Sequence, residues 1–193
     1  MEAIKKIVII GPESTGKSTL CKNLAAHYDS LWVPEYAREY LEKTGTKYSY
    51  ENLLDIAKGQ IALEDQVSVT ILQMAAARSE PPLQLKPLFV DTDMYVMKVW
   101  CEFVFNKCHN WILNRIAERK YDLYLLCDVD LPWVQDALRE YPDKNTREKL
   151  YHFYKDLMVN QSRQWCNISG NYEQRFEKAV NFIESAGLQF AVT

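Results

Sequence analysis

The 193-residue sequence has no excess of positive charge: 23 Lys and Arg residues stand against 26 Asp and Glu residues, for a formal net charge of −3. Domains that bind nucleic acid typically present a basic surface to the phosphate backbone. We therefore expect neither DNA nor RNA to be the main partner. The 5 cysteines are odd in number and lack any Cys-x-x-Cys spacing, which disfavours both a disulfide framework and a zinc site.

Long hydrophobic runs are also missing. The first apolar run holds four residues after Lys6, too few for the core of a signal peptide, and no later run approaches the length of a membrane span. We expect a soluble, cytoplasmic protein without a membrane partner. The length and a hydrophobic content of 48% suit one core, so we predict that residues 1–193 form a single domain. The oligomeric state is not encoded in any pattern that we recognise.

Short apolar runs alternate along the chain with longer segments of helical periodicity. This alternation predicts an α/β fold, a three-layer sandwich in which helices cover both faces of a five-stranded parallel sheet. Ligands of such sheets bind beyond the carboxyl ends of the strands. A linker-like stretch at 79–87 interrupts the pattern without separating two domains. The predicted strands are residues 7–10, 31–33, 88–90, 123–127 and 164–169; the predicted helices are 18–28, 36–43, 50–78, 95–119, 133–139, 147–160 and 172–186.

The stretch GPESTGKS at residues 11–18 matches the P-loop pattern G-x-x-x-x-G-K-[ST] and lies between a predicted strand and a predicted helix, as that pattern requires. Its glycines let backbone N–H groups turn toward phosphate oxygens at a helix N-terminus. Lys17 would reach the β- and γ-phosphates, and Ser18 would supply a hydroxyl to Mg²⁺. We predict that ATP and Mg²⁺ bind here, through Gly11, Glu13, Ser14, Thr15, Gly16, Lys17, Ser18 and Thr19.

A P-loop alone does not distinguish hydrolysis from phosphoryl transfer. Asp91 ends the third predicted strand, where an acidic residue would hold Mg²⁺ together with Ser18. The next residue is Thr92, not the water-orienting Glu expected of a mechanical ATPase. The D-x-x-G and N-K-x-D motifs of GTPase switches are missing too. Asp128 and Asp130 end the fourth strand and compete for the metal role; alternatively they cap the helix predicted after Pro132.

We prefer Asp91, because the third strand of P-loop kinases usually lies beside the first. With right-handed crossovers, this placement predicts the strand order 2-3-1-4-5.

Glu35 follows the second strand and Arg38 lies one helical turn later, so both could face an acceptor, Glu35 taking the proton of a hydroxyl. A solvated helix start explains the pair equally well. Arg139 and Arg147 could belong to a basic segment that closes over the phosphates, or could be surface charges. Trp133 could stack on a base. Aromatic residues in the fourth predicted helix suit core packing: Trp100, Phe103 and Phe105.

Four stretches, GPESTGKST, VPEYAREY, FVDTD and YDLYLLCDVDLPWVQDALRE, together resemble the nicotinamide riboside kinase (ribosylnicotinamide kinase) domain of the bacterial bifunctional nicotinamide-nucleotide adenylyltransferase family. The resemblance runs in order from about residue 5 to 185. It implies that Lys17 and Ser18 serve ATP and Mg²⁺ and that Asp91 belongs to the metal site. It further implies that Glu35, Arg38 and Asp93 bind the riboside, that Trp133 lies near the substrate or lid, and that Arg139 lies in the closing segment.

Two departures from that family pattern are visible: Ala37 replaces the usual Gly, and the H-x-G-H motif of the adenylyltransferase is missing. The resulting hypothesis is ATP-dependent phosphorylation of the 5′-hydroxyl of nicotinamide riboside, a small-molecule substrate, as a step of NAD biosynthesis. Lys17, Mg²⁺ and Arg139 would neutralise the transferred group, and Glu35 or Asp91 would be the base. Another nucleoside or nucleotide kinase, or a P-loop ATPase, is the alternative. We also predict that Glu35, Arg38 and Asp93 converge on one cleft facing Lys17.

Overall fold

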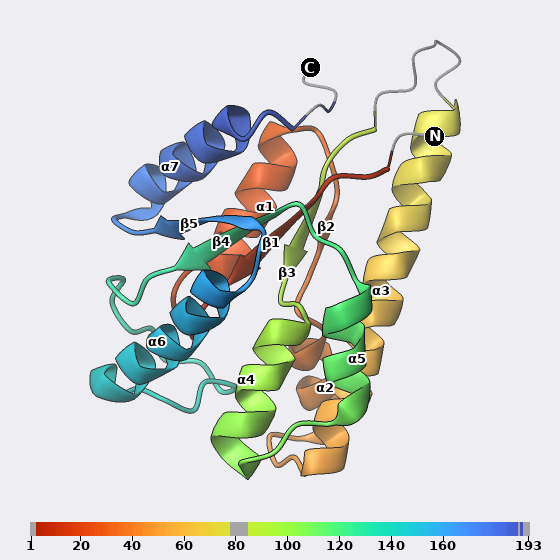
Figure 1. Cartoon of the computed structure of the whole chain (residues 1–193). Helices are drawn as coiled ribbons and strands as arrows, with labels where there is room; N and C mark the ends of the chain where they lie inside the picture. The colour runs from red at the N-terminus through yellow and green to blue at the C-terminus, as the bar shows by residue number, and fades with distance from the viewer. Residues whose placement is uncertain (1–2, 78–84, 189, 191–193) are drawn as a thin grey trace.

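A computed structural model describes residues 3–77, 85–188 and 190 of the chain. Its centre is a sheet of five parallel strands in the order β2-β3-β1-β4-β5, so the predicted fold class and strand order are confirmed (Figure 1). The strands are β1 (Lys6–Ile10), β2 (Trp32–Val33), β3 (Leu88–Asp91), β4 (Leu123–Cys127) and β5 (Gln164–Ile168).

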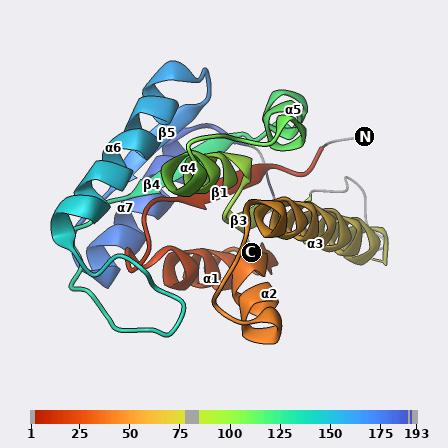
Figure 2. The ribbon, with the colours of Figure 1, turned by 90° about the horizontal axis from the view of Figure 1, so that it is seen from below.

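The central strand β1 shows why the sheet needs cover on both faces. Side chains alternate along a strand, and β1 is apolar at consecutive positions. Ile7 and Ile9 pack on one face with residues of α1 (Lys17–His27) and α7 (Tyr172–Ser185). Val8 and Ile10 pack on the other face with residues of α4 (Met94–Phe105) and α6 (Lys144–Asn160). Helix, sheet and helix thus form three layers (Figures 1 and 2).

Three further helices build a smaller core at one edge of the molecule: α2 (Tyr36–Thr44), α3 (Tyr50–Ala77) and α5 (Asn110–Glu118). They pack with α4 around buried side chains that include Leu41, Ile56, Met97 and Ile112. This arrangement matters for function because it fixes α2 and α4 beyond the carboxyl ends of β2 and β3. In the part of the chain that the structure describes, no helix is both long enough and apolar enough to cross a bilayer.

Three of the predicted helices differ in the structure. The segment 95–119 is broken into α4 and α5, because Asn106 adopts a left-handed conformation with φ 53° and ends α4. Residues 133–139 form no helix; instead they belong to an extended connection between β4 and α6. Helix α6 begins at Lys144, earlier than predicted, because the Asp143 side chain caps it by accepting from Thr146 N. Of the linker-like stretch, residues 79–84 lie outside the described part, as does Arg78.

Candidate active site

The P-loop, residues 11–18, joins β1 to α1 and makes close approaches that favour glycine. Gly11 has φ 137°, and a Cβ there would lie 2.7 Å from the carbonyl oxygen of Cys127. Gly16 caps α1 with φ 78°. The Lys17 ammonium donates to the carbonyl oxygen of Pro12 at 2.7 Å, and the Thr15 hydroxyl donates to the same oxygen at 2.7 Å. Lys17 therefore rests on a neutral carbonyl, a partner that a phosphate oxygen can replace.

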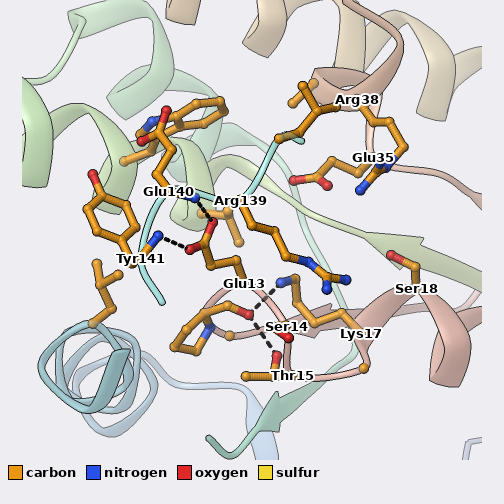
Figure 3. A pocket seen from close by; sticks show the side chains of 18 of the residues that line it. Glu13, Ser14, Thr15, Lys17, Ser18, Glu35, Arg38, Arg139, Glu140 and Tyr141 are labelled. Atoms are coloured by element: carbon orange, nitrogen blue, oxygen red, sulfur yellow. Dashed lines mark hydrogen bonds between the residues drawn. The ribbon is translucent and has the colours of Figure 1, made fainter. Parts of the chain in front are cut away.

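A cavity of about 300 Å³ extends from this loop toward α2, α4 and the start of α6. All eight residues predicted to bind ATP line it, from Gly11 and Glu13 to Thr19. Glu35 and Arg38 of the α2 region line it too, and the Glu35 carboxylate points into it (Figure 3). The far wall is apolar and aromatic and consists mainly of Leu41, Val96, Val99, Trp100, Phe103, Leu138, Leu150 and Tyr154.

Asp91, at the end of β3, is fully buried, and neither carboxylate oxygen has a hydrogen-bond partner of standard geometry. Burial, and to a smaller extent the Glu35 carboxylate, raise the pKa of Asp91 to about 7, although Lys17, the Ser18 hydroxyl and Arg38 act in the opposite direction. A buried, unpartnered carboxylate is costly unless something neutralises it. Its position beside Ser18 fits Mg²⁺, which in nucleotide sites binds one or two protein oxygens and otherwise phosphates and water.

No group of three or more His, Cys, Asp or Glu side chains suited to a metal occurs among the described residues. A Mg²⁺ ion held mainly by phosphates does not require such a group. The two donors present, Ser18 and Asp91, are therefore compatible with the predicted metal site.

The rival carboxylates after β4 are already partnered. Asp128 accepts from Val129 N at 2.7 Å and from the Asn167 side chain at 3.1 Å. Asp130 pairs with Arg175 of α7 and accepts from Gly170 N. Arg175 is itself buried and donates to the carbonyl oxygens of Thr15 and Asp128, each at 3.0 Å. Arg175 thus ties α7 to the P-loop and to the end of β4, and neither acid caps a helix after Pro132.

Asp93 does not line the cavity, so the expected convergence of Glu35, Arg38 and Asp93 is only partly met. The Asp93 carboxylate caps α4 by accepting from Tyr95 N at 3.0 Å and Val96 N at 3.2 Å, and it accepts from the Tyr124 hydroxyl at 3.1 Å. Burial raises its pKa to about 7, although these three bonds lower it. The role of Asp93 in riboside binding therefore has no support from this geometry.

The connection after β4 passes beside the P-loop, and we call residues 133–143 the strap. Its Arg139 side chain extends into the cavity toward Lys17 and Ser18 (Figure 3). Arg38 pairs with Asp136 of the strap at 3.0 Å, so α2 also holds this segment. Trp133 does not line the cavity; its ring lies between Arg139 and Arg147, at 6.0 and 5.3 Å from their guanidinium carbons. The proposed base-stacking role of Trp133 is thus unsupported.

Part of the cavity wall is not predictable from the sequence pattern. Trp100 and Phe103 line the cavity, whereas the pattern assigns them to core packing; Phe105 packs against Tyr48 and Tyr50, as the pattern predicts. Apolar residues at i, i+3 and i+4 predict a buried helical face but cannot tell a core from a cavity wall. Tyr172, at the start of α7, carries no sequence signal either; a Cβ on Gly16 would lie 3.2 Å from its ring.

Two curated relatives match the chain in sequence at low identity. The chain is 22% identical over 188 residues to the trifunctional NAD biosynthesis/regulator protein NadR of Salmonella typhimurium and 24% identical over 185 residues to that of Escherichia coli. These matches cover 94% and 93% of the chain but only 42% of each relative. The chain therefore spans less than half the length of these relatives, and they match the resemblance inferred from the motifs.

Solved structures show the same fold. A NadR protein in complex with NR superposes with a TM-score of 0.75 at 20% identity, covering 98% of this chain and 52% of that one. A thymidylate kinase from Ehrlichia chaffeensis gives a TM-score of 0.58 at 15% identity, covering 94% of this chain and 100% of that one. A family model described as AAA domain matches residues 6–175. Because that match includes most of the chain, the protein belongs to this P-loop AAA domain family.

Proposed function

We propose that this protein is an ATP-dependent kinase that phosphorylates the 5′-hydroxyl of nicotinamide riboside. The observation that carries the proposal is a cavity with the phosphate-binding loop at one end and an aromatic wall at the other. Glu35 and Arg38 lie between these ends, where a hydroxyl would meet the transferred phosphoryl group. The similarity to NadR proteins, one of them in complex with NR, supports the choice of acceptor.

The aromatic wall suits the nicotinamide ring of the riboside, which carries a positive charge. Trp100 is held in place because its indole N–H donates to the Tyr48 hydroxyl at 2.8 Å. Aromatic faces attract cations as well as flat rings. The carboxylates of Glu35 and Glu140, which also line the cavity, add negative charge near this ring. An uncharged pyrimidine would gain the stacking but not this electrostatic attraction.

At the donor end, backbone N–H groups of the P-loop, Lys17 and Arg139 would bind and neutralise the phosphates of ATP. Ser18 and Asp91 would hold Mg²⁺, which supplies further charge neutralisation at the phosphate oxygens when bound. Lys17 would exchange its bond to the Pro12 carbonyl for one to a phosphate.

Glu35 is our candidate for the general base. Its carboxylate faces the cavity and makes no capping hydrogen bond to α2, so it is available to a substrate hydroxyl. Asp91 is a weaker candidate because it does not line the cavity and suits the metal site better. Arg38 would steady the acceptor or the phosphorylated product once it leaves Asp136.

The test is to incubate the purified protein with ATP, Mg²⁺ and one acceptor at a time: nicotinamide riboside, uridine, thymidine, adenosine or thymidylate. Product masses identify which acceptor gains a phosphate group. We expect nicotinamide mononucleotide as the dominant product, and we expect the Glu35→Gln variant to lose this activity while still binding ATP. Faster phosphorylation of another nucleoside or nucleotide would refute the assigned acceptor. Phosphate release with no phosphorylated product would instead favour an ATPase.

A further inference from the structure

Two side chains of the P-loop, those of Glu13 and Ser14, form hydrogen bonds with the backbone of the strap. The Glu13 carboxylate accepts from Glu140 N at 3.0 Å through one oxygen and from Tyr141 N through the other (Figure 3). The Ser14 hydroxyl accepts from Val134 N at 3.0 Å. The P-loop therefore holds the strap at both of its ends, on either side of Arg139.

This attachment fixes the backbone directly beside Arg139. The two amides bound by Glu13 belong to the residues that follow Arg139, and the Arg139 guanidinium donates back to the carbonyl oxygen of Val134, the residue bound by Ser14. The stretch from Val134 to Tyr141 is thus held by a hydrogen bond within itself and by three hydrogen bonds to the P-loop. Its attachment leaves the Arg139 side chain directed into the cavity.

The same contacts connect the two ends of the cavity. The side chain of Glu140, whose amide binds Glu13, accepts from the Tyr48 hydroxyl at 2.9 Å, and Tyr48 in turn accepts from Trp100. A continuous hydrogen-bonded path therefore runs from the P-loop through the strap to the aromatic wall. Arg38 adds a second link through Asp136.

We infer that Glu13 and Ser14 are positioning residues that clamp the strap over the P-loop and so place Arg139 for phosphoryl transfer. This inference rests on the proposed function, in which Arg139 neutralises the transferred group. It adds a role for these two side chains to the expectation that Glu13 and Ser14 belong to the nucleotide-binding loop, in which their backbone N–H groups remain available to the phosphates.

The side chains of Glu13 and Ser14 are chemically suited to holding the strap. Here each of the two N–H donors binds a different oxygen of Glu13, an arrangement that a carboxylate allows and an amide side chain, with one oxygen, does not. Hydrogen bonds to a charged acceptor are also stronger than neutral ones. Ser14 adopts φ 57°, a left-handed conformation that is unfavourable for a residue with a Cβ, whereas glycine would adopt it freely. A serine hydroxyl at this position therefore comes at a conformational cost, which its bond to the strap offsets.

The first experiment measures attachment of the strap without any ligand. Hydrogen–deuterium exchange is followed in peptides from residues 133–143 of the wild type, Glu13→Gln, Ser14→Gly and Ser14→Ala. We expect exchange in this segment to rise about tenfold in each variant, as for loss of one such bond, with β1 peptides unchanged. Ser14→Gly relieves the backbone strain and so keeps the test valid if Glu13→Gln fails to fold. Glu39→Gln, an exposed carboxylate of α2, is the matched control and should exchange as the wild type does.

The second experiment asks whether the clamp acts through Arg139. Phosphorylation of nicotinamide riboside is measured for Glu13→Gln, Arg139→Ala and the double variant. We expect Glu13→Gln to lower kcat about tenfold with the KM for ATP nearly unchanged, and to have almost no further effect once Arg139 is replaced. Additive losses in the double variant, or a raised KM for ATP with unchanged exchange, would overturn the inference and return Glu13 to nucleotide binding.

The two experiments separate failure of the clamp from failure of the proposed function. If the wild type phosphorylates no riboside but hydrogen exchange in the strap rises in the variants, the clamp stands and the acceptor assignment is wrong. The rates of the Glu13→Gln, Arg139→Ala and double variants are then compared for ATP hydrolysis instead. If the wild type is an active riboside kinase but the variants show wild-type exchange and wild-type kcat, the clamp is wrong.

Discussion

The two ends of the cavity are built in different ways. The donor end comes mainly from one continuous segment, residues 11–19, whose backbone groups have a fixed geometry. The acceptor end is assembled from α2, α4, α6 and the strap, which are far apart in the sequence and meet only in the folded chain. A continuous motif can be recognised without a structure. A wall made of dispersed side chains depends on packing, so the class of reaction is easier to infer than its acceptor.

The same difference predicts how substitutions should act. Changes at the donor end should affect transfer to every acceptor, because every acceptor receives the same phosphoryl group. Changes at the acceptor end should discriminate among acceptors and leave ATP use almost untouched. Because the strap contacts both ends, substitutions in the strap should affect ATP use and acceptor use together.

The largest effect should come from Lys17→Ala. This change removes the only lysine that lines the cavity, as far as the structure describes it, and we expect kcat to fall about 10³-fold. Steady-state rates should fall by the same factor for nicotinamide riboside and for any slower acceptor. Lys22→Ala, on the exposed side of α1, is the control and should keep full activity. A loss confined to one acceptor would contradict the division of the cavity into two ends.

Asp91→Asn should separate activity from stability. Removing the metal-site carboxylate should lower the rate about 10²-fold and raise the Mg²⁺ concentration needed for half-maximal rate. Because the Asp91 oxygens are buried without partners, the ligand-free variant should be more stable than the wild type by about 1 kcal/mol. Thermal unfolding and Mg²⁺ titrations of the rate measure the two effects.

Asp128→Asn provides the matched comparison for the metal site. The amide oxygen introduced by this change can still accept from Val129 N, so the Mg²⁺ requirement should stay close to that of the wild type. If Asp128→Asn, and not Asp91→Asn, changed the Mg²⁺ requirement, the metal site would belong to the end of β4.

The sequence predicts the order of the strands but not the conformation of the strap or the wall of the cavity. The sheet order is predictable because apolar strands, the P-loop and Asp91 constrain the topology together. The strap, by contrast, resembles a helix in sequence because Trp133, Val134 and Leu138 are spaced as on a helical face. In the folded chain, its amides instead donate to Glu13 and Ser14, side chains about 120 residues earlier. No local pattern contains such partners, and for the same reason the wall formed by Trp100 and Phe103 has the sequence pattern of a core.

Trp100→Ala tests whether the acceptor end of the cavity binds the riboside independently of ATP. Stacking of a ring on an aromatic side chain contributes about 1–3 kcal/mol, so the KM for nicotinamide riboside should rise about tenfold to hundredfold. The KM for ATP should change less than about twofold. Trp111→Phe, on α5 and away from the cavity, controls for general disturbance of the α2–α5 core. Equal increases in both KM values would mean that Trp100 supports the fold rather than the acceptor.

The smallest effect on catalysis should come from Asp93, which the resemblance assigns to the riboside and the structure places at the start of α4. Asp93→Ala removes the helix cap and leaves the buried Tyr124 hydroxyl unpaired, so the free energy of unfolding should fall by about 2 kcal/mol. Asp93→Asn keeps a good cap, and its amide can donate to Tyr124; it should lose less than about 1 kcal/mol. Denaturant unfolding measures these losses. If Asp93 only supports α4, Asp93→Asn should keep a nearly normal KM for nicotinamide riboside. A large rise in that KM with unchanged stability would instead place Asp93 at the substrate and move the acceptor site toward β3.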